Sequence, residues 1–448
     1  MDIVQALLTD LYELTMAAGY FQAGKAAERA TFELSLRRLP AHRSYVLTAG
    51  LEQAIDYLLQ LRFTPPEIEY LKSLPALSGA PAGFFDYLRQ FRFTGDVWAV
   101  EEGTPLFAGE PVLRVSAPLI EAQLPETYLL STITFQTLIA TKASRMVQAA
   151  AGRGVIEFGT RRAHTPEAGT LGARAAHIGG CAGTSNVEAG YRFGIPAYGT
   201  AAHSWTLAFD SEPEAFARLQ ELLGERTVYL VDTYEMEAGV ENAVAVGGPF
   251  WGLRLDSGDF LVESRIARRI LNRGGYPEAR IMASGDLNEY RIAELVAAGA
   301  PIDWFGVGTE LATSADAPSM GSIYKLVEIE REGRLRGAAK FSPDKFTLPG
   351  AKQVFRFSDH DVVGLAEESF PGAAPLLVPV VRAGARIAER IPLRRIREQA
   401  QQKMAEIPLA CRRLEDPASF PVLHSEPLQA LTAEVRSAEL KTLDSKWA

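Results

Sequence analysis

The stretch Gly194-Ile-Pro-Ala-Tyr-Gly-Thr-Ala-Ala-His-Ser-Trp205 combines the two features from which the fold of this chain is predicted. Residues 195–198 are typical of a short buried strand, and small polar residues follow from Gly199. His203 comes just past the predicted strand end, where an imidazole can touch a ligand. A histidine in such a place more often only hydrogen-bonds to its own loop. The same order, a strand and then a polar end, recurs along the chain.

From residue 151 onward, strand-like and helix-like segments alternate. Alternating βα units at this spacing predict a parallel sheet, and many units in one run favour a closed or nearly closed barrel. The predicted strands are Val155–Phe158, a weaker one before Gly183, Ile195–Tyr198, Val228–Val231, Gly252–Leu255, Arg280–Ala283 and Trp304–Val307. The predicted helices are Asn186–Phe193, Glu212–Leu223, Glu235–Val246, Leu261–Arg273 and Asn288–Ala298.

The segments on either side of the alternating region have a different pattern. The predicted helices there span 1–24, 48–61, 65–74, 83–90, about 121–150, 385–406 and 425–442. The predicted strands span 30–36, 91–100, 111–115, 324–329 and 353–357, and the late strands can return to pair with the early antiparallel ones. This pattern divides the chain into an N-terminal segment (1–125), a barrel (126–325) and return strands with a helical C-terminal segment (326–448).

Composition and charge limit the class of protein. The 448 residues suffice for two or three domains, and 47% hydrophobic and 23% charged residues are ordinary for a globular protein. A net charge of −9 disfavours a nucleic-acid partner, although a single pocket can still be basic. The two cysteines, Cys181 and Cys411, disfavour a disulfide framework and a cysteine zinc site, and they fit the cytoplasm.

No signal-peptide pattern opens the sequence, and no run approaches the ~18 apolar residues of a membrane helix. We therefore expect no membrane partner.

Polar residues follow each predicted strand of the alternating region. In (β/α) barrels the C-terminal strand ends carry the active site, so we expect these residues to converge. They are Gly159-Thr-Arg-Arg162, Gly183-Thr-Ser-Asn186, Gly199 with Thr200 and His203, Asp232-Thr-Tyr234, Arg254 with Asp256-Ser-Gly-Asp259, Ser284-Gly-Asp286 and Gly308-Thr309.

The residue types at these ends indicate a phosphorylated ligand. Glycines let backbone N–H groups approach phosphate oxygens, and Gly306-Val-Gly-Thr309 would form a compact cradle. Arginine binds phosphate or carboxylate in bidentate fashion, and the candidates are Arg161, Arg162 and Arg254. A phosphate pocket with several aspartates needs a cation, which Mg²⁺ would supply. The aspartates are Asp232, Asp256, Asp259 and Asp286, and each alone can be a helix N-cap, Asp286 above all.

As an ordered set, these motifs resemble those of nicotinate phosphoribosyltransferases. The resemblance runs from residue 8 to about 357 and matches poorly after about 360. No single motif would suffice, but the set is specific. It comprises Leu8-Thr-Asp-Leu-Tyr-Glu-Leu-Thr-Met16, Glu157-Phe-Gly-Thr-Arg-Arg162, Gly183-Thr-Ser-Asn-Val187, Gly199-Thr-Ala-Ala-His-Ser204, Arg254-Leu-Asp-Ser-Gly-Asp259, Ser284-Gly-Asp286 and Phe305-Gly-Val-Gly-Thr309.

The resemblance implies a type II phosphoribosyltransferase fold. That fold is α/β, an irregular (β/α) barrel with an α+β sandwich domain built from N-terminal and post-barrel segments, here followed by a helical C-terminal segment. It implies an enzyme of NAD salvage that converts nicotinate and phosphoribosyl pyrophosphate into nicotinate mononucleotide and pyrophosphate. Coupled hydrolysis of ATP, a Mg²⁺ cofactor and a homodimer with shared active sites are implied as well.

The resemblance also implies roles for individual residues. The pyridine ring would lie between Phe158 and Tyr12 of the neighbouring subunit, and the histidine phosphorylated by ATP would be His203. Thr200 and Arg254 would orient the nicotinate, and Ser185 could donate a hydrogen bond to its carboxylate. Arg161 would face the phosphoribosyl pyrophosphate, Gly308 and Thr309 would bind its 5-phosphate, and Gly285 would also be substrate-binding. Asp232 and Asp256 would act beside Mg²⁺ and the pyrophosphate.

Two other functions remain possible on the sequence alone. A nicotinamide phosphoribosyltransferase shares the fold, but those relatives carry an acidic residue where this chain has Ser185. Ser185 can instead serve only as the cap of a helix that starts near Asn186. A non-catalytic ligand-binding relative is disfavoured because Arg161, His203 and both aspartates of the expected magnesium site are present.

Overall fold

The computed structural model describes residues 6–342 and 345–447 and divides into two compact units. The first unit consists of Met1–Thr137, Ser319–Ile391 and Lys403–Ala448, and the second of Leu138–Pro318 and Pro392–Gln402. The sequence-based division near residues 125 and 325 stays a prediction. No sequence pattern indicated that the short late segment from Pro392 belongs with the second unit.

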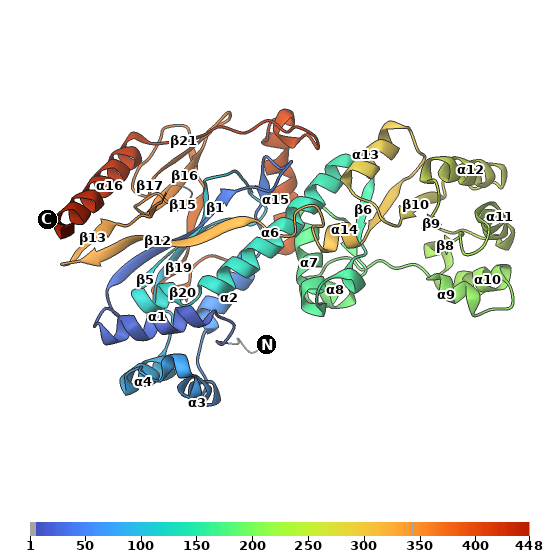
Figure 1. The fold of residues 1–448 in the computed structure, drawn as a ribbon. Coiled ribbons are helices and arrows are strands. Elements are labelled where there is room, and N and C mark those ends of the chain that lie inside the picture. The colour runs from blue at the N-terminus through green and yellow to red at the C-terminus, as the bar shows by residue number, and fades with distance from the viewer. Residues whose placement is uncertain (1–5, 343–344, 448) are drawn as a thin grey trace. The chain divides into compact units, whose positions relative to one another are not determined.

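A seven-stranded antiparallel sheet forms the centre of the first unit (Figure 1). Its order is β13 (Arg334–Gly337), β12 (Gly321–Arg331), β1 (Arg29–Arg38), β5 (Pro111–Pro118), β3 (Asp96–Val100), β19 (Leu377–Arg382) and β20 (Ala385–Arg386). β1 pairs with β12 on one side and β5 on the other. The late strand at 321–331 thus returns to the sheet of the early strands, as predicted, but it pairs with β1 and not with the strands of residues 91–120.

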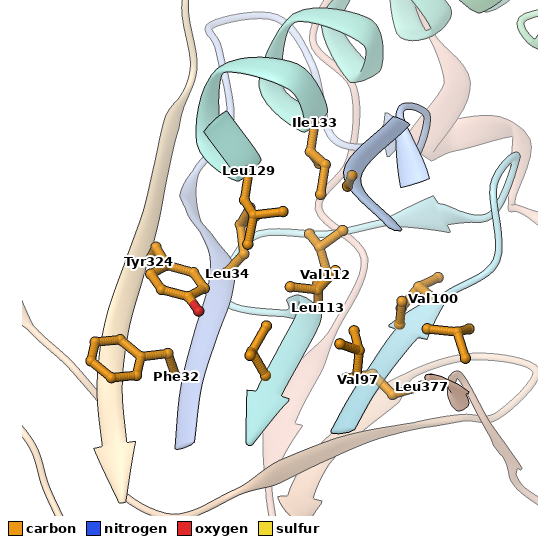
Figure 2. Close-up of a cluster of buried hydrophobic side chains, with 14 of the residues drawn as sticks. Phe32, Leu34, Val97, Val100, Val112, Leu113, Leu129, Ile133, Tyr324 and Leu377 are labelled. Carbon is orange, nitrogen blue, oxygen red and sulfur yellow. The ribbon is translucent and has the colours of Figure 1, made fainter. Parts of the chain in front are cut away.

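A second sheet shares its core with the first. Its order is β18 (Ala374–Pro375), β16 (Lys352–Arg356), β17 (Asp361–Leu365) and β21 (Val422–His424), so the predicted strand 353–357 pairs here and not with the early strands. Val354 and Val363 belong to the same buried cluster as Phe32 and Leu34 of β1. Figure 2 shows part of this cluster under Leu129 and Ile133, which lie on the helix α6 (Glu126–Ala149).

β1 is covered on both faces along residues 30–34, all of which are buried. Phe32 stacks on Tyr324 of β12 with ring centroids 5.2 Å apart. On the opposite face, the buried Glu33 carboxylate lies 2.8 Å from the Lys352 ammonium and accepts the Lys352 backbone N–H. An ion pair and an aromatic pair thus join segments some three hundred residues apart in the sequence.

The helices of the first unit are α1 (Leu11–Gln22), α2 (Leu51–Gln60), α3 (Pro65–Ser73), α4 (Ala82–Gln90), α5 (Leu119–Gln123), the start of α6, the end of α15 (Leu393–Glu406) and α16 (Glu426–Trp447). Several predicted limits in this unit were wrong.

The helix predicted over 1–24 starts at Leu11, and residues 1–5 lie outside the described part. The helix predicted over 121–150 breaks at Pro125, which lacks the N–H that a helix interior needs. The helix predicted from 385 starts only after Pro392, and residues 91–95 are not a strand.

The second unit contains a six-stranded parallel sheet. Its order is β7 (Gly183–Thr184), β6 (Gly154–Glu157), β11 (Trp304–Val307), β10 (Arg280–Ser284), β9 (Gly252–Leu255) and β8 (Val228–Leu230). The last strand thus pairs with the first, as in a barrel. No described pair joins β8 to the β7 side, so closure into a barrel stays a prediction.

The predicted strand 195–198 was wrong. It is reduced to one isolated bridge between Ala197 and Thr184. Gly194 has a positive φ of 67°, and Pro196 offers no ladder N–H, so a longer strand is disfavoured.

The helices that were predicted between residues 186 and 298 lie close to their predicted limits, and the second unit contains further helices that were not predicted. The helices of this unit are the rest of α6, α7 (Pro166–Ile178), α8 (Val187–Phe193), α9 (His203–Leu207), α10 (Glu212–Leu223), α11 (Met236–Val246), α12 (Phe260–Arg273), α13 (Glu289–Ala297), α14 (Thr309–Ala312) and the start of α15. The sequence analysis missed α7, α9 and α14. Aromatic side chains pack between the strands, and a Cβ on Gly306 would come within 2.6 Å of the Phe158 ring.

Candidate active site

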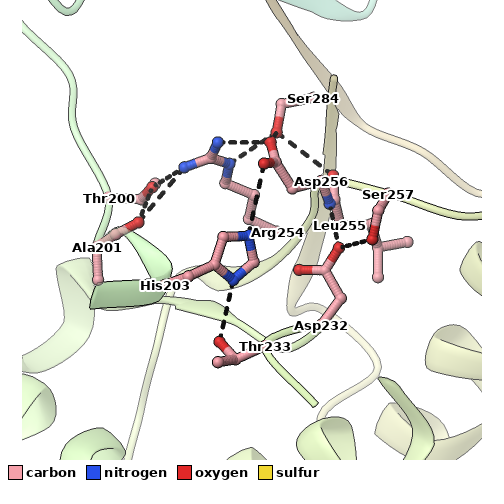
Figure 3. A network of polar contacts seen from close by, with 10 residues as sticks. All are labelled: Thr200, Ala201, His203, Asp232, Thr233, Arg254, Leu255, Asp256, Ser257 and Ser284. Carbon is pink, nitrogen blue, oxygen red and sulfur yellow. Dashed lines mark hydrogen bonds and ion pairs between the residues drawn. The ribbon is translucent and has the colours of Figure 1, made fainter. Parts of the chain in front are cut away.

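Side chains from four segments of the second unit meet at the C-terminal ends of β8, β9 and β10 (Figure 3). They come from the Thr200–His203 loop, the Asp232–Thr233 loop after β8, Arg254 of β9 with the loop that follows, and Ser284 at the end of β10. Sequence analysis predicted this convergence from the polar residues after each strand, and the parallel sheet produces it. Among the predicted site residues, Thr200, His203, Asp232, Arg254 and Asp256 are brought together.

Arg254 is the centre of this cluster, and its side chain is only 12% exposed. Its Nε donates to Ser284 Oγ at 2.7 Å, and its NH1 donates to Thr200 Oγ1 at 2.8 Å and to the Ala201 carbonyl at 3.4 Å. Its NH2 donates to Asp256 Oδ1 at 2.6 Å. The guanidinium is therefore fixed in orientation before any ligand arrives.

Asp256 is held as an anion by these neighbours. Burial on its own would raise its pKa, but the hydrogen bond from Ser284 at 2.6 Å and the Arg254 charge outweigh burial and hold the pKa below its usual value. The backbone N–H of Asp256 donates to Asp232 Oδ2 at 2.8 Å, and Ser257 Oγ donates to the same oxygen at 2.8 Å. The two aspartates are thereby joined through one loop.

The second carboxylate oxygen of Asp232 fits a metal ligand. This Oδ1 atom is buried and has no hydrogen-bond partner in the described structure. Among the described residues, no group of three or more His, Cys, Asp or Glu side chains could hold a metal by itself. Mg²⁺ in phosphoryl sites is commonly held by one or two carboxylates together with substrate phosphates, and Asp232 with Asp256 matches that donor set.

His203 lies at the first position of α9 and faces both aspartate loops. Its Nδ1 is 3.1 Å from Thr233 Oγ1, and its Nε2 is 3.7 Å from Asp256 Oδ2. The His203 side chain is 40% exposed, so one ring edge is open to a ligand. The histidine is therefore not explained by hydrogen bonds to its own loop.

Phe158 and Ser185 lie near the end of β6. The Phe158 ring centroid is 5.8 Å from the Arg254 guanidinium carbon. The backbone N–H of Ser185 donates to the Glu157 carbonyl at 2.9 Å. The cap of α8 is Asn186, whose side chain accepts the Ala189 N–H, so the alternative role of Ser185 as that cap was wrong.

Other predicted residues are not among the hydrogen-bond partners found for Arg254 in the described part of the chain. Arg161 is exposed in a short 3₁₀ turn, Gly308 and Thr309 open α14, and Tyr12 belongs to the first unit. Asp259 is the N-cap of α12, whereas Asn288 and not Asp286 caps α13. Gly306 lies inside β11 against Phe158, so the predicted cradle begins only at Gly308.

Sequence analysis did not select four residues that organise the site. Ser284 accepts a hydrogen bond from Arg254 and donates one to Asp256. Ser257 donates to Asp232, and Thr233 contacts His203. The buried Glu157 accepts the Gly159 N–H and the Thr184 hydroxyl. Burial raises the pKa of Glu157, and its hydrogen bonds only partly offset this. All four residues stood inside the segments quoted above, and their position at strand ends was the available signal.

Comparison with known proteins gives one consistent result along the chain. The model of the nicotinate phosphoribosyltransferase N-terminal domain matches residues 7–134, that of the nicotinate phosphoribosyltransferase family matches 154–343, and that of the C-terminal domain matches 368–432. The last match corrects the sequence analysis, which found only a poor likeness after residue 360.

Individual relatives agree with the family models. A nicotinate phosphoribosyltransferase of Mycobacterium tuberculosis is 43% identical over 97% of this chain and 95% of its own length. That of Bacillus subtilis is 44% identical over 81% and 76%. The crystal structure of human nicotinic acid phosphoribosyltransferase matches with a TM-score of 0.84 at 28% identity and covers 96% of this chain and 100% of its own. Within the described residues, no helix has the length and apolar character that a membrane crossing requires.

Replacing Ser284 with alanine tests the electrostatics of this cluster. The variant loses the hydroxyl that stabilises ionised Asp256, so the pKa of Asp256 should rise and the unfolding free energy should fall by ~1 kcal/mol at pH 7. A lowered carboxyl pKa stabilises the fold above the unfolded pKa, and this contribution is lost as pH falls through the folded pKa. The difference between parent and variant in urea unfolding should therefore shrink below about pH 4.

Ser264→Ala is the matched control, because Ser264 is a buried serine of the same unit whose hydroxyl, within the described residues, donates to the Leu261 carbonyl and to no carboxylate. Its effect should be independent of pH. A pH-independent loss in Ser284→Ala as well would contradict the stabilisation of an Asp256 anion.

Proposed function

The chain belongs to the nicotinate phosphoribosyltransferase family, and on that premise we propose that the Arg254 cluster binds nicotinate while His203 couples ATP cleavage to the reaction. The protein is a nicotinate phosphoribosyltransferase of NAD salvage, acting on nicotinate and phosphoribosyl pyrophosphate. The observation that carries the proposal is the fixed, nearly buried guanidinium of Arg254 between Thr200 and Asp256.

We expect the nicotinate carboxylate to bind the one N–H group of Arg254 that has no acceptor among the hydrogen bonds described above. Four hydrogen bonds occupy four of the five guanidinium N–H groups of Arg254, which leaves one for a carboxylate. A cation that is already oriented loses little side-chain entropy on binding. The Phe158 ring beside the guanidinium offers an apolar face to a pyridine. Charge and ring together favour a pyridine that carries a carboxylate.

The phosphoribosyl pyrophosphate would lie across the strand ends. Gly308 and Thr309 offer N–H and hydroxyl groups for the 5-phosphate. A Cβ on Gly285 would lie only 2.2 Å from the Asp256 carbonyl oxygen, so this turn can approach Asp256 because the residue is glycine. Asp232 and Asp256 would hold Mg²⁺, which when bound would neutralise charge on the leaving pyrophosphate. Arg161 would approach the same substrate from its exposed turn.

Little acid–base chemistry is required of the chain. The pyridine nitrogen attacks the anomeric carbon with its lone pair and has no proton to lose, while the bond to pyrophosphate breaks. The positive charge that builds on the sugar and the negative charge that builds on pyrophosphate make positioning and electrostatics the main sources of rate. A site with oriented Arg, Asp and Thr groups and a single facing histidine suits this reaction.

His203 would accept the γ-phosphoryl group of ATP. If the Nδ1–H donates to Thr233 Oγ1, the lone pair is left on Nε2, which is the atom that faces Asp256. The nitrogen–phosphorus bond then forms as the bond to ADP breaks, and water later releases phosphate. The phosphorylated ring would stand beside the proposed Mg²⁺ and pyrophosphate site, where its added negative charge would change the binding of both.

A second copy of this chain is the proposed occupant of the exposed face of α1 and the turn before it. Four large apolar side chains recur there at helical spacing with exposures of 37% to 51%, namely Leu8, Leu11, Tyr12 and Met16. Such a stripe is typical of an interface. Because Tyr12 lies in it, a homodimer would bring this ring to the partner's site.

His203→Ala should abolish ATP hydrolysis and acid-labile phosphoprotein, because the acceptor nitrogen is gone. Slow mononucleotide formation without ATP should persist, since the Arg254 cluster survives. Phosphate release and product are measured together, and His360→Ala is the control because the His360 imidazole contacts Asp359 and Phe357 of its own turn. ATP hydrolysis at the parental rate in step with product would exclude His203 as the acceptor.

Mixing Tyr12→Ala with His203→Ala protein tests the shared site. Heterodimers should regain activity, because one of their two sites contains both parental residues. Activity is assayed after subunit exchange has been verified by native mass spectrometry. Complete exchange without any recovered activity would argue against a site built from two subunits.

Ser185→Asp should erode the preference for nicotinate over nicotinamide. A second carboxylate ~4 Å from that of nicotinate would cost about 4 kcal/mol at an effective dielectric of ~20, whereas serine can donate a hydrogen bond. The kcat/KM values for both substrates in parent and variant give the ratio. Since Asn186 caps the helix, an unchanged ratio would move the discrimination away from Ser185.

A further inference from the structure

The second unit contains a buried ion network around Lys142 that takes no part in the chemistry above. The Lys142 side chain, on α6, is 1% exposed. Its Nζ lies 2.6 Å from Glu289 Oε2, 2.8 Å from Asp316 Oδ1 and 3.6 Å from Glu310 Oε2. Arg145, nearly one turn later, donates from Nε to Glu289 Oε1 at 2.9 Å. Two cations thus serve three carboxylates.

The carboxylates stand on the segments that follow two neighbouring strands, β10 and β11. Glu289 is the first residue of α13, shortly after the Gly285 turn. Glu310 directly follows Thr309 in α14, and Asp316 lies in the loop after α14. The ammonium of Lys142 therefore connects the chain behind Gly285 with the chain behind Gly308 and Thr309.

α14 depends on outside contacts for its position. It has four residues, and a helix of one turn is not stable alone in water. Its apolar side is fixed, because Leu311 is buried and Ala312 lies where a Cβ on Gly159 would come within 2.5 Å. Glu310, 32% exposed, supplies the polar contact to Lys142. Loss of that contact would let Thr309 move while the apolar contacts persist.

We propose that Lys142 is a positioning residue for phosphoribosyl pyrophosphate, which it serves by holding the Gly308–Thr309 segment through Glu310 and Asp316. The inference rests on the proposed function, in which that segment binds the 5-phosphate. A buried ion pair adds little net stability, because desolvation offsets most of the attraction. It does fix geometry, and a displacement of ~1 Å at a reacting group can cost ~100-fold in rate.

The test compares Glu310→Gln and Lys142→Met with the parent and with Glu294→Gln. Glu294 is a surface carboxylate of α13 paired only with Arg291 in the described structure, so its variant is the matched control. We expect the KM for phosphoribosyl pyrophosphate to rise ~10-fold or more in both test variants, with the KM for nicotinate within ~2-fold of the parent. The melting temperature should fall in Lys142→Met and stay near the parental value in Glu310→Gln, which retains the buried lysine.

Binding of phosphoribosyl pyrophosphate with Mg²⁺, measured by calorimetry, separates the two ideas. If the parent and Glu310→Gln bind it equally while Thr309→Ala binds it weakly, the positioning role is overturned and the proposed site stands. If the parent binds it but Thr309→Ala does so with unchanged affinity, the 5-phosphate assignment itself has failed. Lys142→Arg keeps the charge and should fall between the parent and Lys142→Met in the KM for this substrate.

Discussion

The placement of the Arg254 guanidinium is the constraint on which the active site depends. A cation that is only 12% exposed must find acceptors, and it finds them on three different segments, at Thr200, Asp256 and Ser284. These segments cannot move independently once they share one charge. The close approach also explains Gly285, which has a φ of 111° and whose Cβ would stand 2.2 Å from the Asp256 carbonyl. An alanine there would push apart the loops after β9 and β10.

A second charge network, buried at Lys142, acts in the same way on the segments that follow β10 and β11. Lys142 and Arg145 bind Glu289 at the start of α13, and Lys142 also lies near Glu310. Arg254 plays the same part for the loops that contain Thr200, Asp256 and Ser284. Both networks use a cation fixed by several acceptors to define positions in short, irregular segments. The apolar core alone could not do so, because dispersion contacts tolerate small shifts that directional hydrogen bonds do not.

The sequence predicted the parallel strands and most helices of the second unit nearly to the residue, because alternation of βα units is a local signal. It failed where non-local geometry decides. Residues 195–198 look like a strand but carry Pro196 after a left-handed Gly194, and only one bridge forms. The polar strand ends were predicted to converge, yet nothing local indicated that Ser284 would join Arg254 to Asp256. Lys142 and Arg145 stand three residues apart in an otherwise largely apolar stretch of helix. This spacing indicated a buried ion network, but the sequence analysis did not use it.

The central claim is that an oriented cation at Arg254 selects a pyridine carrying a single carboxylate at the reacting site. The most direct measurement incubates the protein with phosphoribosyl pyrophosphate, Mg²⁺ and ATP, offers nicotinate, nicotinamide or quinolinate, and identifies the mononucleotide by mass spectrometry. The account predicts nicotinate mononucleotide from nicotinate and little product from the other two. Product formed from nicotinamide as readily as from nicotinate would contradict it.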